Sequence, residues 1–276
     1  MPGTLFVVAT PIGNLDDITL RALRVLREVP LIAAEDTRRT AHLLVRHGIA
    51  TSTTSLHEHN EQQKSSALIR HLVGGQDLAL VSDAGTPTIS DPGARLVRAA
   101  IESGIRVEPV PGPNAAIAAL SASGLIADEF VFLGFPPTRL KDRKVWLDRV
   151  AAIGGVVVFY EAPHRIERTL ADLVERVGDR TGLLARELTK THEQLVIGPI
   201  SSLVTRLSST KGEFTVILDV GAPRQDMSSI GQSTENVAVS RRSMVAKFAA
   251  ELGVPANDLY RAVEKLRDIG SMTNKE

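Results

Sequence analysis

The sequence predicts an α/β protein with two domains and a short helical tail. The chain has 276 residues, which suits about two domains of roughly 100–200 residues each. In the first half, short apolar runs alternate with helical patterns, an order that is typical of a mostly parallel sheet. Further strand-like runs in the second half indicate a second sheet of mixed or antiparallel order. We expect a first domain over residues 1–125, a second over 126–222, a linker over 223–239 and a helix-turn-helix-like tail over 240–276.

The composition excludes several classes of protein. The formal net charge is zero, so no global field attracts the chain to nucleic acid or membrane, and a polyanion would have to be met by a local patch. Cysteine is absent, which excludes disulfides, thiolate catalysis and cysteine-ligated metals. The first residues lack the basic start of a signal peptide, and no apolar run approaches the roughly 18 residues of a membrane span. We therefore expect a soluble, cytoplasmic protein.

The first two strands each end in a polar segment. Residues 5–9 are predicted to form a short buried strand, followed by the loop 10–15 and then a helix. The loop is not Gly-x-Gly-x-x-Gly, and this dinucleotide-binding fingerprint is absent from the whole chain. Residues 31–34 form the second predicted strand, and Glu35 and Asp36 follow it directly. These carboxylates either begin a helix, where acidic residues are favoured, or face a pocket as a base or a ligand-binding group.

A third strand is expected over residues 55–59, with His57 and His59 near its end. His-x-His lacks the third and fourth ligands that zinc takes, so we expect no metal here and place both histidines on the surface or at a pocket rim. A polar helix over 61–73 then leads to the centre of the domain.

Two apolar strands with Gly/Pro-rich loops organise the first domain. Residues 78–81 run into the loop 82–93, and residues 107–110 run into the loop 111–114, with a helix over 94–101 between them. In open α/β sheets, ligands bind outside the carboxyl ends of the strands. Loops this long and this poor in bulky side chains predict a pocket wall for a flat, polar small molecule, although Gly and Pro also mark ordinary turns. A small-residue helix is expected to follow, up to residue 123.

The second domain contains the most basic stretch of the chain. It follows a strand predicted over 130–135 and leads into a helix. The stretch carries four basic side chains and one indole: Arg139, Lys141, Arg143, Lys144 and Trp146. It is either a solvated helix start or a phosphate contact in which Trp146 is a stacking platform.

Charged side chains also gather where later strands end. Strands are expected over 155–161, from 181, over 194–198 and over 212–218, with helices over 166–177 and 201–207. The clusters are Glu161 with Arg165, and Arg186 with Glu187 and Lys190. They form either a structural ion-pair network or a cleft between the domains that holds an anionic substrate.

The tail has the pattern of two short helices. Residues 222–239 are rich in Ser, Gln and Asn, which is typical of a linker. Residues 244–263 then show helical periodicity on both sides of a turn at Gly253, the spacing of a helix-turn-helix. Arg241 and Arg242 would contribute phosphate contacts, so the tail is either a nucleic-acid reader or a packing hairpin.

Six ordered motifs carry a resemblance to a known family. They are Thr10–Leu15, Ala34–Arg38, Ser82–Gly93, Pro111–Ala115, Phe159–Arg165 and Ala185–Lys190. Together they resemble the tetrapyrrole methylase family, the class III S-adenosylmethionine-dependent methyltransferases, over about residues 4–220. Relatives that use tetrapyrroles carry a Gly-Pro-Gly-Asp-like first loop. Here it reads Thr-Pro-Ile-Gly, which favours the RNA-modifying branch.

The resemblance implies two α/β domains with S-adenosylmethionine in the cleft between them, and a homodimer. It also implies 2′-O-ribose methylation of a cytidine near the decoding centre of small-subunit (16S) rRNA, either as RNA or in the assembled 30S subunit. The cofactor contacts it implies are Thr10, Pro11, Asp83, Gly85, Thr86, Gly112, Pro113, Asn114, Ala115, Tyr160, Arg186, Glu213 and Phe214.

Chemistry assigns roles to the remaining charged residues. A sulfonium methyl needs little activation, so catalysis depends mainly on in-line placement of the hydroxyl; a nearby base or cation helps it lose its proton. The candidates for that role are Glu35, Asp36, Glu161 and Lys190. Contacts to RNA are expected from Arg38, Arg165 and Arg186, which would hold phosphates bidentately, and from Arg139, Lys141, Arg143, Lys144, Arg241 and Arg242.

Two other functions stay open. The same fold and cofactor would serve a tetrapyrrole or another small acceptor, and an α/β sensor with a helix-turn-helix reader would be no enzyme at all. A hydrolase is disfavoured, because the chain has no Gly-x-Ser-x-Gly.

Overall fold

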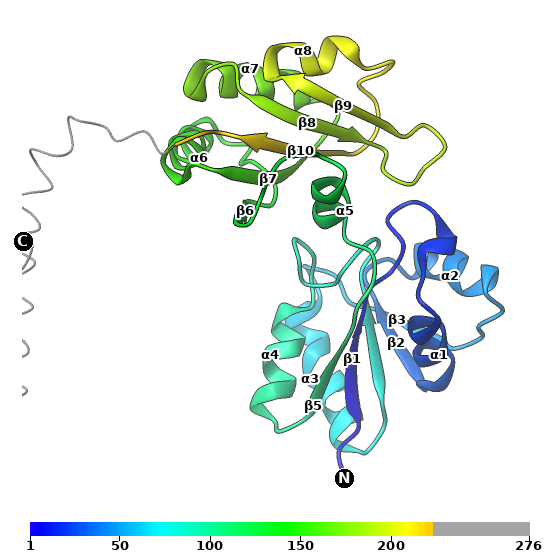
Figure 1. Cartoon of the computed structure of the whole chain (residues 1–276). Coiled ribbons are helices and arrows are strands. Elements are labelled where there is room, and N and C mark those ends of the chain that lie inside the picture. The colour runs from blue at the N-terminus through cyan, green and yellow to red at the C-terminus, as the bar shows by residue number, and fades with distance from the viewer. Residues whose placement is uncertain (223–276) are drawn as a thin grey trace, which may run out of the picture. The chain divides into compact units, whose positions relative to one another are not determined.

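The computed structural model describes residues 1–222, which contain two five-stranded sheets (Figure 1). The predicted α/β class with two sheet-based halves is confirmed. The predicted linker, the helical tail and with them Arg241 and Arg242 lie outside the described residues. No helix within residues 1–222 is long and apolar enough to cross a membrane.

The first sheet is parallel throughout. Its strand order is β3-β2-β4-β1-β5. The strands are β1 (Thr4–Val8), β2 (Leu31–Ala34), β3 (Ser52–Ser55), β4 (Leu78–Val81) and β5 (Arg106–Val110). The helices that connect them are α1 (Leu20–Glu28), α2 (Thr37–Arg46), α3 (Glu61–Val73) and α4 (Ala94–Glu102), with a 3-10 turn at Leu15–Asp17. Because neighbouring strands run the same way, the loops after β2, β4, β1 and β5 lie side by side at one edge of the sheet.

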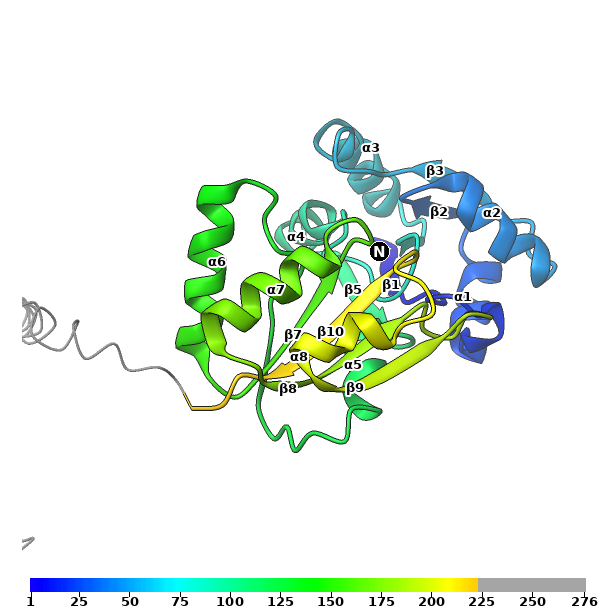
Figure 2. The same cartoon turned by 90° about the horizontal axis from the view of Figure 1, so that it is seen from above.

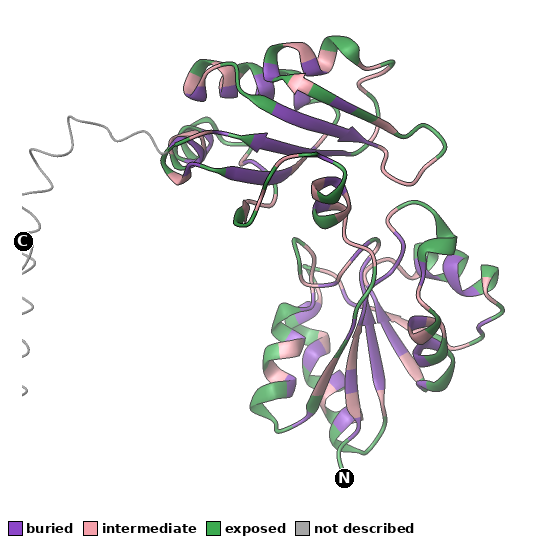
Figure 3. Ribbon diagram, in the orientation of Figure 1, coloured by how far each residue is buried: buried purple, intermediate pink, exposed green. Residues whose placement is uncertain are grey.

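Both faces of this sheet are apolar. Side chains alternate along β1, so Phe6 and Val8 pack with the core under α1 and α2, while Leu5 and Val7 pack with the core under α3 and α4. Burial on both sides explains why the strands read as continuous apolar runs. Figure 3 shows the central strands of both sheets as largely buried.

The second sheet is mixed. Its order is β6-β7-β10-β8-β9; β6 pairs in parallel with β7, and the other pairings are antiparallel. The strands are β6 (Phe130–Phe132), β7 (Val156–Glu161), β8 (Thr181–Arg186), β9 (Gln194–Pro199) and β10 (Phe214–Asp219). The helices α6 (Leu140–Ile153), α7 (Ile166–Val177) and α8 (Ile200–Leu203), with a 3-10 turn at Val204–Arg206, lie on one face (Figure 2).

The short helix α5 (Ala115–Ser121) covers the other face of the second sheet. Ala116 and Ala119 pack against Val158 and Ile217, and small residues allow this close approach. The sequence predicted the domain boundary after residue 125, and that boundary stays a prediction. Because α5 already packs on the second sheet, the chain passes from the first sheet to the second before α5, close to Pro113.

Some predicted elements have different bounds. The third strand lies at Ser52–Ser55, before the histidines rather than over them. The strand predicted over 130–135 ends at Phe132, and the helix predicted up to residue 123 ends at Ser121. These shifts matter for the site, because they leave residues 133–137 free to form a loop.

Candidate functional site

Three loops at the edge of the first sheet form one continuous wall. Thr10 and Gly85 exchange two backbone hydrogen bonds, of 2.9 and 3.0 Å, which join the loop after β1 to the loop after β4. The hydroxyl of Thr86 donates to the carbonyl of Pro113 at 3.2 Å, which adds the loop after β5. Gly85 has φ +79°, a left-handed conformation that glycine adopts without strain.

The end of β2 is joined to the same wall by carboxylates. The Asp83 backbone N–H donates to Glu35 at 3.2 Å, and the Asp36 backbone N–H donates to Asp83 at 3.0 Å. Arg39 approaches the Asp83 carboxylate at 3.4 Å. Strand-end carboxylates are therefore fixed in place before any ligand binds.

The loop after β4 holds two strained residues. Thr88 and Ser90 have φ of +71° and +67°, which is costly for side chains other than glycine and persists only where the surroundings impose it. The buried Glu61 supplies part of that restraint, because its Oε1 accepts the backbone N–H groups of Gly93 and Arg95 at 3.1 and 2.9 Å. Strain of this kind clusters at functional sites.

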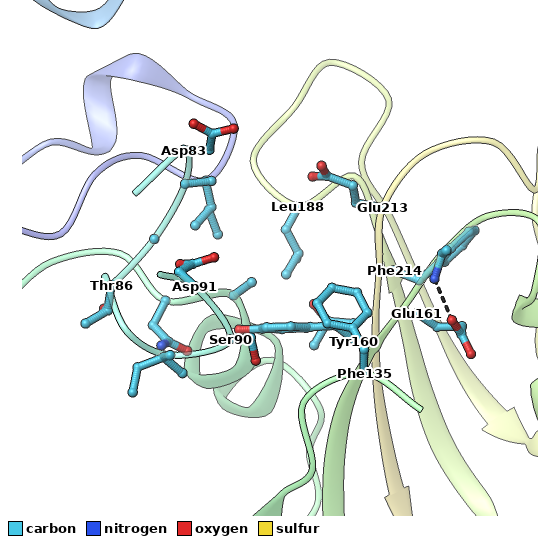
Figure 4. A pocket seen from close by; sticks show the side chains of 18 of the residues that line it. Asp83, Thr86, Ser90, Asp91, Phe135, Tyr160, Glu161, Leu188, Glu213 and Phe214 are labelled. Carbon is cyan, nitrogen blue, oxygen red and sulfur yellow. Dashed lines mark hydrogen bonds between the residues drawn. The ribbon is translucent and has the colours of Figure 1, made fainter. Parts of the chain in front are cut away.

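The second sheet closes the other side of the pocket. Tyr160 on β7 packs edge-on against Phe132 and at a tilt against Phe135, with ring centroids 5.0 and 5.4 Å apart. Leu188 after β8 and Glu213 before β10 line the same cavity, which has a volume of about 360 Å³. Figure 4 shows their side chains facing the residues of the first sheet across this space. The volume lies in the range of small-molecule sites.

Burial changes the acidity of three pocket groups. It raises the pKa of Glu35 and of Tyr160 above their ordinary values. For Asp91, burial together with the negative charge of Glu35 raises the pKa to about 6. Two carboxyl groups with raised pKa values in one cavity are typical of a functional site rather than of a solvated surface.

Most of the predicted cofactor residues line this cavity. Those that do are Asp83, Gly85, Thr86, Asn114, Ala115, Tyr160, Glu213 and Phe214. Thr10 and Pro11 line a small adjoining hollow of about 50 Å³. Their contact with a cofactor stays a prediction.

Three other predicted cofactor residues are not part of the cavity lining. Gly112 packs against Ala9, where a Cβ would approach the Ala9 Cβ to 3.0 Å, and Pro113 accepts the Thr86 hydroxyl. Arg186 is buried and donates to the carbonyl oxygens of Lys211 and His192 at 2.5 and 3.0 Å. Its guanidinium is thus engaged by backbone, which argues against both the predicted cofactor contact and the predicted phosphate contact.

The four candidate catalytic groups lie in different surroundings. Glu35 lines the cavity. Asp36 lies outside it as the N-cap of α2, and hydrogen bonds from Arg38 lower its pKa to about 2. Lys190 also lies outside the lining, between Glu187 and Glu213 at 3.0 and 2.9 Å. Burial alone would lower the pKa of Lys190, but these hydrogen bonds outweigh it and raise the pKa. The structure therefore favours Glu35 among the four.

Glu161 has a structural environment. It borders the cavity, but its side chain is fully buried. It accepts hydrogen bonds from Ala162 N at 2.7 Å and Thr169 Oγ1 at 2.5 Å, and it forms an ion pair with Arg165 Nη2 at 2.6 Å. Arg165 donates in addition to the carbonyl of Pro136 at 3.1 Å. Both carboxylate oxygens are engaged by these partners, which argues against a base at this position.

The basic stretch divides between surface and core. Arg139, Lys141 and Lys144 are exposed, as is Arg38, and their contacts to RNA stay predictions. Arg143 is buried and donates to Asp172 at 2.7 Å and to Thr169 at 2.8 Å. An arginine that is buried and paired in this way has few donors left for a phosphate, which argues against the predicted RNA contact.

Trp146 is also buried. Its ring packs edge-on against Phe159 with centroids 5.2 Å apart. The interpretation of Trp146 as a stacking platform was therefore wrong, because the indole belongs to the core between α6 and the second sheet.

Sequence reasoning missed several lining residues, among them Asp91, Phe135 and Leu188. Asp91 lies within the Gly/Pro-rich loop from which the wall was predicted. Its place in the cavity depends on residues of the second sheet, which are distant in the sequence. Phe135 had been assigned to a strand. Within residues 1–222, no group of three or more His, Asp or Glu side chains has the geometry of a metal site.

Comparison with known proteins gives a consistent result. Residues 4–204 match the family described as tetrapyrrole (corrin/porphyrin) methylases. A protein named ribosomal RNA small subunit methyltransferase I from Pseudomonas aeruginosa is 48% identical, over 94% of this chain and 96% of its own. A protein of the same name from Halalkalibacterium halodurans is 43% identical, over 94% and 93%.

Solved structures agree on the fold. Diphthine synthase has a TM-score of 0.63 at 15% identity, over 78% of this chain and 90% of its own. Uroporphyrin-III C-methyltransferase from Thermus thermophilus, complexed with S-adenyl homocysteine, has a TM-score of 0.57 at 18% identity, over 79% and 98%. At these identities the likeness concerns the fold.

Proposed function

The chain belongs to the tetrapyrrole (corrin/porphyrin) methylase family, and from this premise we propose that it transfers a methyl group from S-adenosylmethionine to a ribose 2′-hydroxyl of small-subunit rRNA. The choice of acceptor is supported by relatives that are 43–48% identical over 94% of the chain and bear the rRNA methyltransferase name. The observation that carries the proposal is the cavity of about 360 Å³, lined by residues of both sheets.

The lining fits the methyl donor. Ala84, Gly85 and Ala115 leave room for a flat base, because they have little or no side chain. The carboxylates of Asp83 and Glu213 are acceptors of the kind that ribose hydroxyls require. Glu35 and Asp91 add acidic character next to them, which favours a cationic ligand. Bound there, S-adenosylmethionine supplies a methyl group on a positively charged sulfur that leaves readily.

The protein's own contribution is placement. The loops of the first sheet line one side of the cavity, and the rings of Tyr160 and Phe135 line the other. In-line alignment of two reactants accounts for a large part of the rate in reactions of this kind.

We further infer the finer features that family membership suggests. The target is a cytidine near the decoding centre of 16S rRNA, in the RNA itself or in the assembled 30S subunit, and a homodimer meets it in the cytoplasm. The exposed Arg38, Arg139, Lys141 and Lys144 supply phosphate contacts. A tetrapyrrole or another small acceptor is the alternative, since it needs the same cavity and the same donor.

Mapping of the methyl group tests the proposal. Small subunits from a strain that lacks this protein are incubated with it and labelled S-adenosylmethionine, and the RNA is analysed by nuclease digestion and mass spectrometry. We expect label on the ribose of one cytidine. Label on a base, or transfer to precorrin-type acceptors but not to the subunit, would contradict the choice of acceptor.

A further inference from the structure

The carboxylates in and around the cavity differ in how they are held. Four of them are bound by cations: Asp36 by Arg38 at 2.9 Å, Asp83 by Arg39 at 3.4 Å, Glu161 by Arg165 at 2.6 Å and Glu213 by Lys190 at 2.9 Å. Glu35 forms no ion pair in the described part of the chain, but it accepts the backbone N–H of Asp83 and so joins β2 to the loop after β4. Each of these five groups thus has a structural partner.

Asp91 is held differently. Among residues 1–222 it takes part in no ion pair, and its carboxylate has a hydrogen bond with Ser82. The neighbouring backbone is nevertheless fixed, because Ser90 has φ +67° and Glu61 binds the N–H of Gly93 at 3.1 Å. Figure 4 shows the Asp91 carboxylate pointing into the cavity from the side opposite Leu188 and Glu213. Its position is thus fixed by the loop, while the carboxylate, beyond its bond with Ser82, can accept further hydrogen bonds from a ligand.

We propose that Asp91 is the general base of the methyl transfer and accepts the proton of the attacking ribose hydroxyl. This inference rests on the function proposed above. As the O–H bond breaks, the proton passes to the Asp91 carboxylate, and the hydroxyl oxygen forms a bond to the methyl carbon. The carbon–sulfur bond breaks at the same time, and its electron pair stays on sulfur, which becomes a neutral thioether. Asp91 then releases the proton to water.

The groups around Asp91 raise its pKa toward the range that suits a general base. The groups that face it are Glu35 at the end of β2, Asp83 in its own loop and Tyr160 on β7, and Arg39 on α2 is the cation beside Glu35 and Asp83. Burial and the charge of Glu35 raise the pKa of Asp91 to about 6. A base with a pKa near the working pH combines the ionised form with useful basicity. Activity should therefore rise with pH through about 6, as Asp91 ionises.

Asp91→Asn tests the role directly, because asparagine keeps the size of the side chain but cannot take up the proton. On small subunits we expect the rate of methyl transfer to fall about 10²–10⁴-fold and the acidic limb of the pH–rate profile to disappear. Calorimetric affinity for S-adenosylmethionine should stay within about threefold. Asp91→Glu should restore part of the rate and the acidic limb, and Glu102→Gln, an exposed carboxylate on α4, controls for loss of negative charge.

Glu35→Gln separates the two pocket acids. Because the charge of Glu35 raises the pKa of Asp91, its removal should move the acidic limb to lower pH and leave the limb present. If the limb instead vanishes in Glu35→Gln and persists in Asp91→Asn, Glu35 is the base and the proposal is wrong.

Other outcomes also decide the matter. A rate for Asp91→Asn within about threefold of wild type, or a fall that follows lost affinity for S-adenosylmethionine, would overturn the role of Asp91 alone. A wild-type protein that leaves small subunits unmethylated would overturn the proposed function, and the base with it.

Discussion

Arg143 illustrates how a charged residue can belong to the core. In the sequence it stands among Lys141 and Lys144 as part of one basic stretch, yet it is buried while they are exposed. The reason is helical periodicity: Arg143, Trp146 and Val150 share the buried side of α6. Composition of the stretch predicted a phosphate-binding surface, whereas the 3.6-residue period would have assigned Arg143 and Trp146 to the interior.

Substitution of Arg143 should therefore affect stability. Arg143→Ala leaves the carboxylate of Asp172 without its partner and the hydroxyl of Thr169 without a donor. Breaking a buried pair in this way costs about 3 kcal/mol of the free energy of unfolding, measured by urea denaturation. Lys144→Ala, one residue away and exposed, should change it by less than about 0.5 kcal/mol. Equal stability of the two variants would contradict the assignment.

At the scale of elements, the loop after β4 depends on a residue that lies outside the pocket lining. Glu61, at the start of α3, caps the N-terminus of the separate helix α4. Its Oε1 accepts hydrogen bonds from the backbone N–H groups of Gly93 and Arg95, at 3.1 and 2.9 Å. An anionic cap on first-turn N–H groups is favourable for both hydrogen bonding and the helix dipole. The contact also fixes the end of the loop that carries Asp91.

Glu61→Ala should thus weaken both stability and binding. Two N–H groups lose a charged acceptor, which we expect to cost about 2 kcal/mol of unfolding free energy. The freed loop should also lower the affinity for S-adenosylmethionine. Glu61→Gln keeps the Oε1 acceptor and should lie between wild type and alanine in both measurements. An affinity unchanged in Glu61→Ala would show that the cap does not position the site.

The elements differ in how far their sequences predicted them. β2 and β4 have the predicted bounds, because a strand buried on both faces is a continuous apolar run. The third strand was predicted to begin at residue 55, but β3 begins at Ser52. The reason is that Ser52–Ser55, at the edge of the sheet, reads Ser-Thr-Thr-Ser and has no apolar pattern. The pocket loops were predicted from Gly and Pro alone. Phe135 and Asp91 were not assigned to the site, because their exposure to the cavity is set by the opposing sheet.

At the scale of the molecule, the two sheets contact each other beside the cavity. The loop after β1 meets the loop after β8, where the Asn14 N–H donates to the Thr189 hydroxyl at 3.0 Å. Gly13 permits this contact: a Cβ there would lie 2.5 Å from the Lys190 Cγ and 2.7 Å from the Leu188 carbonyl oxygen. Glu187 and Thr189 have φ of +50° and +64°, so the backbone on the second-sheet side is strained to meet it.

Gly13→Ala should separate these two loops without altering a residue that lines the cavity. Crowding of this kind costs about 1–3 kcal/mol. If about 1.4 kcal/mol of that cost falls on the bound state, the affinity drops roughly tenfold. Gly74→Ala, after α3 and away from the cavity, is the matched control; its new Cβ would meet only backbone oxygens at 3.3 Å.

The most direct test of whether residues of both sheets bind the methyl donor together is calorimetry. S-adenosylhomocysteine, the donor without its methyl group, is titrated into wild type, Gly13→Ala and Gly74→Ala. The predicted result is saturable binding to wild type, equal binding to Gly74→Ala and about tenfold weaker binding to Gly13→Ala. No heat of binding with wild type, or the same affinity in all three proteins, would contradict it.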